Sequence, residues 1–321
     1  MNVLIGIFAC LLLSAANPLA ATPQQPPAAK NALTTMLKSM QTLNYQGTVV
    51  FLRDGKLEPM RYINAAAQGR EQERLISLNA PLREIIRDTG NASNLLKTTR
   101  QRNTGNRPFE YSFLIDMPNN LDDLDANYTL SVLGEETIAL QPAYIIGIQP
   151  KDQLRYARKI WLQKEHFLPL KATVYNHAGK TVEQLVFTEL IVKDTLPFAN
   201  TQPVKNDIMQ SNAANSAEAA FIIKKLPSGF RELFFTRRPL HNSTQLVDHL
   251  LLGDGLALVS VYMEHATASP PSTNTSKTVQ SLGAINFFSQ TLGAFEFTVM
   301  GEVPSETVRL IAENIKLREK K

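Results

Sequence analysis

The chain has 321 residues, a formal net charge of +4 and a single cysteine, Cys10. This length predicts two domains rather than one. The small positive charge is not clustered into the basic stripe of a nucleic-acid-binding protein, so we expect no nucleic-acid partner. With one cysteine, the chain cannot form an internal disulfide or a metal site built from several thiolates.

The first 21 residues have the pattern of a secretory signal peptide. Val3 to Leu13 is an unbroken apolar run, and about 11 residues are too few to cross a hydrocarbon layer of roughly 30 Å as a helix. The small residues Ala20 and Ala21 fit a cleavage site. Cleavage would remove Cys10, and an exported chain without cysteine is typical of the bacterial periplasm. We therefore predict a signal peptide over residues 1–21 and a periplasmic location.

A leader and a short helix follow the signal peptide. Residues 22–29 are rich in Pro and Gln, which predicts a flexible leader. Apolar residues then recur at i, i+3, i+4 and i+7, the spacing of one helix face. Asn31 is the predicted N-cap of this helix. The apolar face consists of Leu33, Met36, Leu37 and Met40.

From Asn44 to Val192 the pattern changes to short β-branched and aromatic runs separated by turns. The clearest hairpin is at Asp54-Gly55, because a type I′ turn needs positive φ at both central residues. A long antiparallel sheet must curl and cover one of its faces. We therefore predict an α+β fold for residues 30–192, with a large curved antiparallel sheet, covering helices and an apolar cavity.

The remaining chain divides into a linker and a smaller domain. Residues 193–217 contain prolines and little periodicity, which predicts a linker. Residues 218–321 predict a smaller antiparallel β domain, with Gly253-Asp254-Gly255 as a hairpin turn between two strand patterns. Pro304 and Ser305 begin a C-terminal helix. The apolar stripe of that helix is Val308, Ile311, Ala312 and Ile315.

Residues that often carry catalysis are present without the spacing that catalysis needs. The five histidines form no H-x-x-x-H pair, and no G-x-S-x-G motif offers a nucleophilic serine. Asp122, Asp123 and Asp125 lack the Gly and Glu of a calcium loop, so a solvated loop is the simpler interpretation. We therefore predict no enzymatic activity, no metal and no cofactor. The adjacent Arg237 and Arg238 could hold carboxylates in a bidentate manner, and a solvated rim explains the pair equally well.

Ordered short motifs point to a known family. The second domain carries L-P-S-G-F from Leu226, R-R-P-L from Arg237, G-D-G-L from Gly253 and V-M-G-E-V-P from Val299. The first domain carries L-N-Y-Q-G from Leu43, I-W-L from Ile160 and L-P-L from Leu168. In this order, the motifs resemble both domains of the RseB/MucB family of sigma-E regulators. The resemblance covers nearly the whole chain after residue 21.

The resemblance implies a first domain similar to the lipoprotein carriers LolA and LolB, a half-barrel closed by helices over an apolar cleft. It implies that both domains bind the periplasmic domain of a single-pass anti-sigma factor and shield it from site-1 proteolysis. Lipopolysaccharide or lipoprotein acyl chains are the implied signals for release. The candidate anti-sigma-binding residues are Phe230, Arg237 and Arg238. The candidate lipid-cleft residues, chosen by strand pattern, are Met60, Tyr62, Ile85, Trp161 and Leu170.

An alternative function is a periplasmic lipid or lipoprotein carrier in which the second domain is accessory. The sequence does not decide between a monomer and a homo-oligomer. Two segments, 91–105 and 269–277, depart from the family pattern and bear on how a ligand would enter.

Overall fold

The computed structural model describes residues 26–79, 81, 83–88, 112–115, 117–118, 120–200, 218–239, 245–266 and 279–318. The predicted signal peptide, the first part of the leader, segments 91–105 and 269–277, and the linker after residue 200 lie outside these ranges. No helix within the described ranges is long and apolar enough to cross a membrane.

Helix α1 (Ala29–Thr42) covers the large sheet. It begins before Asn31, and its N-cap is Ala28, which makes no side-chain cap hydrogen bond. The prediction of Asn31 as the N-cap was therefore wrong, because alanines with high helix propensity extend the helix towards the N-terminus. The predicted apolar stripe is confirmed, since Leu33, Met36 and Met40 are buried.

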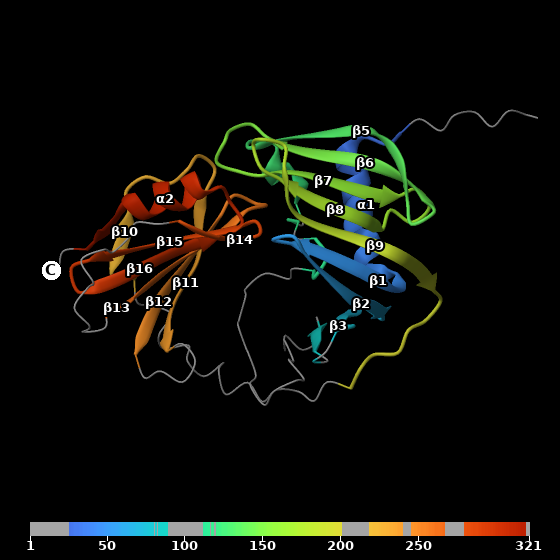
Figure 1. Cartoon of the computed structure of the whole chain (residues 1–321), viewed down its shortest axis with the longest axis horizontal. Helices are drawn as coiled ribbons and strands as arrows, with labels where there is room; N and C mark the ends of the chain where they lie inside the picture. The colour runs from blue at the N-terminus through green and yellow to red at the C-terminus, as the bar shows by residue number, and fades with distance from the viewer. Residues whose placement is uncertain are drawn as a thin grey trace, which may run out of the picture.

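The first domain is one antiparallel sheet of nine strands in the order β4-β3-β2-β1-β9-β8-β7-β6-β5. Asp54 and Gly55 have φ angles of 50° and 72°, as the predicted hairpin turn requires. The sheet curves around α1 without closing into a barrel (Figure 1), so the predicted fold class is confirmed. The strands are β1 (Asn44–Arg53), β2 (Lys56–Ala67), β3 (Arg70–Ser77), β4 (Glu84–Asp88), β5 (Tyr128–Ile138), β6 (Gln141–Pro150), β7 (Ala157–Gln163), β8 (Pro169–Tyr175) and β9 (Thr181–Lys193).

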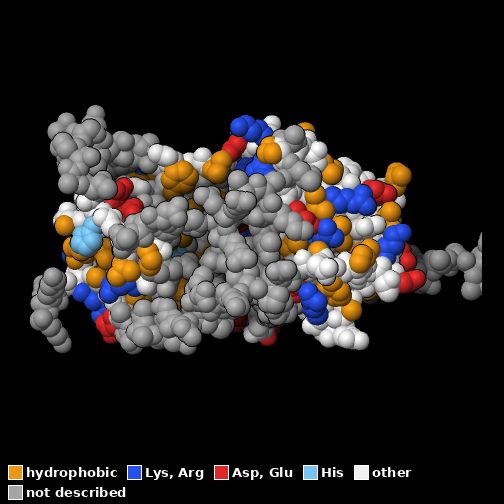
Figure 2. Space-filling model, turned by 90° about the horizontal axis from the view of Figure 1, so that it is seen from below, with side chains coloured by type: hydrophobic (Ala, Val, Ile, Leu, Met, Phe, Trp, Pro, Cys, Tyr) orange, Lys and Arg blue, Asp and Glu red, His pale blue; other side chains and the backbone are white. Residues whose placement is uncertain are grey.

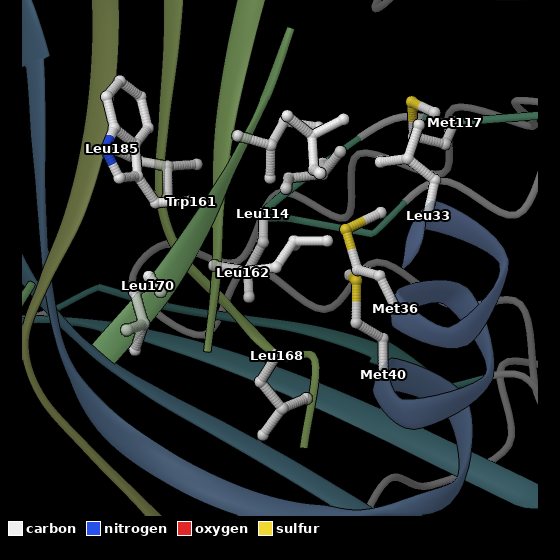
Figure 3. Close-up of a cluster of buried hydrophobic side chains, with 14 of the residues drawn as sticks. Leu33, Met36, Met40, Leu114, Met117, Trp161, Leu162, Leu168, Leu170 and Leu185 are labelled. Atoms are coloured by element: carbon white, nitrogen blue, oxygen red, sulfur yellow. The ribbon is translucent and has the colours of Figure 1, made fainter. Parts of the chain in front are cut away.

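The core of the first domain lies between α1 and the concave face of the sheet. Apolar residues of α1 face leucines from β7 and β8 and from the segment that precedes the short 3-10 helix η1 (Leu121–Leu124) (Figure 3). Burying these side chains offsets the loss of chain entropy on folding. The residues labelled there include Leu33, Met36, Met40, Leu114, Leu162 and Leu168.

Leu162 provides a test of this packing. Its side chain is fully buried, and it points from β7 towards α1 (Figure 3). We expect Leu162→Ala to lower the free energy of unfolding by about 2–5 kcal/mol, because the change leaves a cavity under the helix. Urea unfolding measures this change, with the highly exposed Leu140→Ala as the control. Equal stabilities of the two variants would contradict the packing.

The second domain is a six-stranded antiparallel sheet in the order β11-β12-β13-β16-β15-β14, beside a two-stranded sheet of β10 and β17. Helix α2 (Ser305–Glu313) packs on β15 and β16 and begins after Pro304, as predicted. The last residue of the predicted stripe, Ile315, is buried but lies in β17 rather than in the helix. The strands are β10 (Phe221–Ile223), β11 (Arg231–Pro239), β12 (Leu246–Gly253), β13 (Leu258–His265), β14 (Gln280–Leu282), β15 (Ile285–Leu292), β16 (Phe295–Gly301) and β17 (Ile315–Leu317).

Charges of both signs are mixed on the surface. On the face drawn in Figure 2, the blue and red side chains of the described residues are interspersed among apolar and neutral ones. This distribution differs from the single-sign field that attracts nucleic acid.

Candidate functional site

An apolar cavity of about 160 Å³ opens at one end of the large sheet. This is the end where β1, β7, β8 and β9 reach the second domain (Figure 1). Residues 112–115 and Met117 form its other wall. The apolar lining residues are Phe51, Leu52, Phe113, Leu114, Ile115, Met117, Ile160, Ala172, Val174 and Leu185. Four charged residues, Arg53, Arg158, Glu183 and Glu302, lie among the lining residues.

A buried carboxylate fastens the wall segment to the sheet. Glu73 is fully buried in β3. It accepts hydrogen bonds from the Tyr62 hydroxyl at 2.7 Å, from the Phe113 backbone N–H at 3.0 Å and from the Ser112 hydroxyl. The Arg87 guanidinium lies 2.7 Å from the same carboxylate and neutralises its charge. This cluster holds the segment that begins at Ser112 in place, because each buried polar group has a partner.

A buried ion pair joins the two domains. Arg155 of the first domain contacts Asp254 in the β12–β13 turn, and neither side chain has exposed surface. The Arg155 guanidinium also donates to Asp152 and to the Ser228 carbonyl, and it lies 4.9 Å from the centre of the Phe230 ring. The ion pair thus fixes the β12–β13 turn against the first domain.

Tyr128 completes this cluster. Its hydroxyl donates to Asp254 at 2.9 Å. Burial and the negative charge of Asp254 raise the pKa of Tyr128 well above its ordinary value, so the hydroxyl stays protonated and remains a donor. Leu256, which follows the ion-paired aspartate, packs into the hydrophobic core of the first domain.

Further polar contacts extend the junction towards the cavity. Asn286 of β15 donates to the Tyr156 hydroxyl at 2.8 Å, and Thr307 of α2 donates to the Leu154 carbonyl at 2.8 Å. The Arg158 guanidinium lies 3.4 Å from Glu302, at the mouth of the cavity. In the β14–β15 turn, the Ala284 N–H donates to Glu183 at 3.1 Å. The two domains are therefore held in one defined arrangement.

Gly229 allows a close approach at this junction. Its φ is +79°, and an added Cβ would lie 2.3 Å from the Asn127 side chain. We expect Gly229→Ala to lower the free energy of unfolding by about 1–3 kcal/mol through backbone strain and this collision. Gly55→Ala is the matched control, because its φ is +72° with open space around it. Thermal unfolding should show the larger loss for Gly229→Ala, and equal losses would remove the collision from the explanation.

The structure places the five candidate cleft residues away from this cavity. Met60, Tyr62 and Leu170 are buried in the core, and Ile85 is partly buried in β4. Trp161 lies on the opposite side of β7 from α1 (Figure 3). There its indole N–H donates to Glu136 at 2.5 Å and its ring lies 4.2 Å from the Lys171 Nζ. Alternation along the strand explains the difference, since neighbouring Ile160 faces the cavity.

The candidate anti-sigma-binding residues lie in two places. Phe230 is buried at the domain junction beneath Arg155. Arg237 lies in β11 and donates two hydrogen bonds to Asp248, one of them at 2.8 Å, so it already has a carboxylate partner within its own domain. The side chain of Arg238 lies outside the described part of the structure. Among the described residues, no cluster of His, Cys, Asp or Glu has the geometry of a metal site.

Sequence reasoning placed Arg155 and Asp254 in family motifs but gave them no role at the domain junction, and it did not single out Glu73. Asp254 between two glycines was interpreted as a hairpin turn and as part of the G-D-G-L motif. The turn is present, and its aspartate also pairs with the other domain.

The fold and the junction define a class: a two-domain binding protein with an apolar cavity that opens beside the domain interface. Residues 28–207 match the MucB/RseB N-terminal domain, and residues 215–316 match the MucB/RseB C-terminal domain. The chain belongs to the MucB/RseB family.

Several known proteins are similar along almost their full length. The sigma-E factor regulatory protein RseB of Escherichia coli K12 is 26% identical over 324 residues, covering 96% of this chain and 97% of RseB. The sigma factor AlgU regulatory protein MucB of Pseudomonas aeruginosa is 25% identical over 319 residues, covering 95% of this chain and 96% of MucB.

Solved structures share the two-domain fold. MucB in the complex structure of Pseudomonas aeruginosa MucA/MucB superposes with a TM-score of 0.71 at 25% identity, over 91% of this chain and 99% of that one. MucB in complex with MucA(peri) gives a TM-score of 0.69 at 24% identity, over 91% of this chain and 100% of that one.

Proposed function

We propose that this chain is a non-enzymatic periplasmic regulator of sigma-E signalling. It binds the periplasmic domain of a single-pass anti-sigma factor and shields that domain from site-1 proteolysis, and lipid amphiphiles such as lipopolysaccharide weaken the binding. The observation that carries the proposal is membership of the MucB/RseB family over both domains. Relatives in the family are named as regulators of sigma factors, and one relative has been solved in a complex with MucA.

The geometry supports inhibition by occlusion. An extended peptide that lies across both domains needs them in a constant arrangement, and the junction around Arg155 and Asp254 provides one. Preorganisation of this kind reduces the cost of ordering the site on binding. A protease then cannot reach the bound segment.

Charge reversal in β11 tests the predicted contact residues. We expect Arg237→Glu/Arg238→Glu to weaken binding of the anti-sigma periplasmic domain from the same genome by about tenfold or more, if the arginines hold its carboxylates. Isothermal titration calorimetry measures the affinity. The matched control is Arg231→Glu/Arg309→Glu, which makes the same charge change at two exposed positions.

Arg237 also pairs with Asp248, so the folding of each variant is checked by its unfolding temperature. Arg237→Gln, which keeps a hydrogen-bond donor, serves as the milder variant. Equal affinity of the wild type and a folded Arg237→Glu/Arg238→Glu variant would remove these arginines from the binding site.

The alternative is a lipid or lipoprotein carrier. The match to the MucB/RseB family over both domains favours the regulator, because a carrier would need the second domain only as an accessory. Native mass spectrometry separates the two functions. A carrier would be purified with one lipid per chain, whereas the regulator is expected to be purified without stoichiometric lipid.

A further inference from the structure

We propose that the outer face of the small sheet formed by β10 and β17 is a docking surface for an anionic phospholipid bilayer. In this contact, lysine side chains meet lipid phosphates and one exposed isoleucine enters the head-group layer. Docking of this kind goes beyond the proposed function and does not require it.

The register of the two strands places four side chains on this outer face. Ile222 lies opposite Lys316 in the antiparallel pair, so the two side chains project on the same side. The backbone N–H groups of Lys224 and Arg318 continue the ladder, since each donates to a carbonyl of the opposite segment at 2.9 Å. Alternation along each strand therefore puts Lys224 and Arg318 on the side of Ile222 and Lys316.

The inner face of the small sheet is filled by the core of the second domain. Phe221 and Ile315 are buried there, and the Phe221 ring meets the Phe297 ring edge-on with the ring centres 5.3 Å apart. The four side chains of the outer face are all exposed. Strand β10 lies at the end of the second domain away from the first domain (Figure 1), so this surface is separate from the domain junction and the cavity.

Two lysines of the outer face have no acidic partner. Among the described residues, neither Lys224 nor Lys316 forms an ion pair with a carboxylate. The contact between their two amino groups, followed by the repulsion between their charges, lowers the pKa of Lys224. A phosphate group relieves this repulsion, because its oxygens can accept hydrogen bonds from both lysines. Arg318 contributes less, since it already pairs with Glu218 at 2.7 Å.

Ile222 favours a lipid bilayer over an acidic peptide as the partner. Its side chain is 38% exposed, directly opposite Lys316. A surface that combines basic side chains with a protruding aliphatic one matches the bilayer interface, where phosphates lie above acyl chains. The hydrocarbon stems of the lysines can lie along that interface while their ammonium groups reach the phosphates. An acidic peptide would use the charges and leave the isoleucine in water.

The test is the partitioning of residues 22–321 onto lipid vesicles. These residues are the predicted exported form and include every described residue. One set of vesicles contains equal parts of phosphatidylglycerol and phosphatidylcholine, and the other contains phosphatidylcholine alone. Co-sedimentation gives the partition coefficient at low and at high salt.

We expect the wild type to bind the anionic vesicles, to bind the neutral ones far less, and to be released by salt, which screens exposed charges. Lys224→Gln/Lys316→Gln should weaken partitioning by about tenfold or more. Ile222→Ser should weaken it by about threefold or more, because the aliphatic contact is lost. The matched control, Lys56→Gln/Lys180→Gln, removes two positive charges at exposed positions of the first domain and should bind like the wild type.

A fluorescent label at position 222 measures insertion directly. The single cysteine, Cys10, lies before residue 22, so an Ile222→Cys variant of residues 22–321 carries one thiol. An environment-sensitive dye on that thiol should shift its emission to shorter wavelength on anionic vesicles. Leu140→Cys, at a highly exposed position of the first domain, is the control and should show no shift.

The docking surface is rejected if the wild type does not partition onto anionic vesicles or binds neutral ones equally well. It is also rejected if Lys224→Gln/Lys316→Gln, with a wild-type unfolding temperature, binds as the wild type does. Tighter binding of a soluble glutamate-rich peptide, with no dependence on Ile222, would overturn the bilayer in favour of a protein partner. Binding of the anti-sigma domain is measured separately in solution, so failure of either experiment leaves the other result intact.

Discussion

Asp254→Ala is expected to separate the unfolding of the two domains. The substitution leaves Arg155 buried without its main partner, and loss of one member of a buried ion pair costs about 3–5 kcal/mol. Urea unfolding is followed by the fluorescence of the single tryptophan and by circular dichroism. We expect both signals to change at the same urea concentration in the wild type, and the two domains to unfold in separate transitions in Asp254→Ala. The lost free energy of unfolding comes from the contacts between the domains rather than from either hydrophobic core.

Two further variants make the result specific. Glu218→Ala removes an exposed ion pair with Arg318 in the same domain and should leave the curve unchanged. Arg155→Leu/Asp254→Leu removes both charges and should recover part of the lost stability, since no unpaired charge remains buried. If Asp254→Ala kept coincident transitions and wild-type stability, the ion pair would not hold the domains together.

Glu73→Ala is expected to release the wall of the cavity. The substitution removes the acceptor for Tyr62, Ser112 and the Phe113 N–H, and it leaves Arg87 with Glu71 as its remaining acidic partner. We expect a loss of about 3 kcal/mol in the free energy of unfolding. Amide hydrogen exchange at Phe113 should become faster by a larger factor than exchange in β7, because the segment loses its attachment before the sheet opens.

Glu84→Ala is the matched control for this variant. Glu84 of β4 pairs with Arg74 of β3 at 2.7 Å, so the variant also removes one carboxylate and one ion pair from this part of the sheet. It should change the exchange rate at Phe113 little. Similar exchange at Phe113 in both variants would show that Glu73 does not fasten the segment.

Local patterns predicted most of the fold. The helix stripe at Leu33, Met36 and Met40 and the hairpin at Asp54-Gly55 follow from spacing and backbone conformation, which depend on neighbouring residues only. Strand β15 is hard to predict because its sequence, I-N-F-F-S-Q-T-L, mixes polar residues into the strand pattern. The wrong N-cap at Asn31 arose because preceding alanines continue the helix, a preference that a capping pattern does not include.

The candidate site was harder to predict, because its residues acquire their roles from distant partners. Arg155 and Asp254 are 99 positions apart, and Ser112 and Glu73 are 39 positions apart. Trp161 shows a second difficulty. The aromatic character of a strand residue does not tell which face of a curved sheet it occupies.

The position of Leu256 has a consequence for biosynthesis. This side chain comes from the β12–β13 turn and packs with the core of a domain whose own strands end at Lys193. Leu256 is added 63 residues after Lys193, so the strands of the first domain are complete before this core side chain is made. An N-terminal half that emerges alone is therefore expected to expose an unfilled apolar site until the C-terminal half arrives.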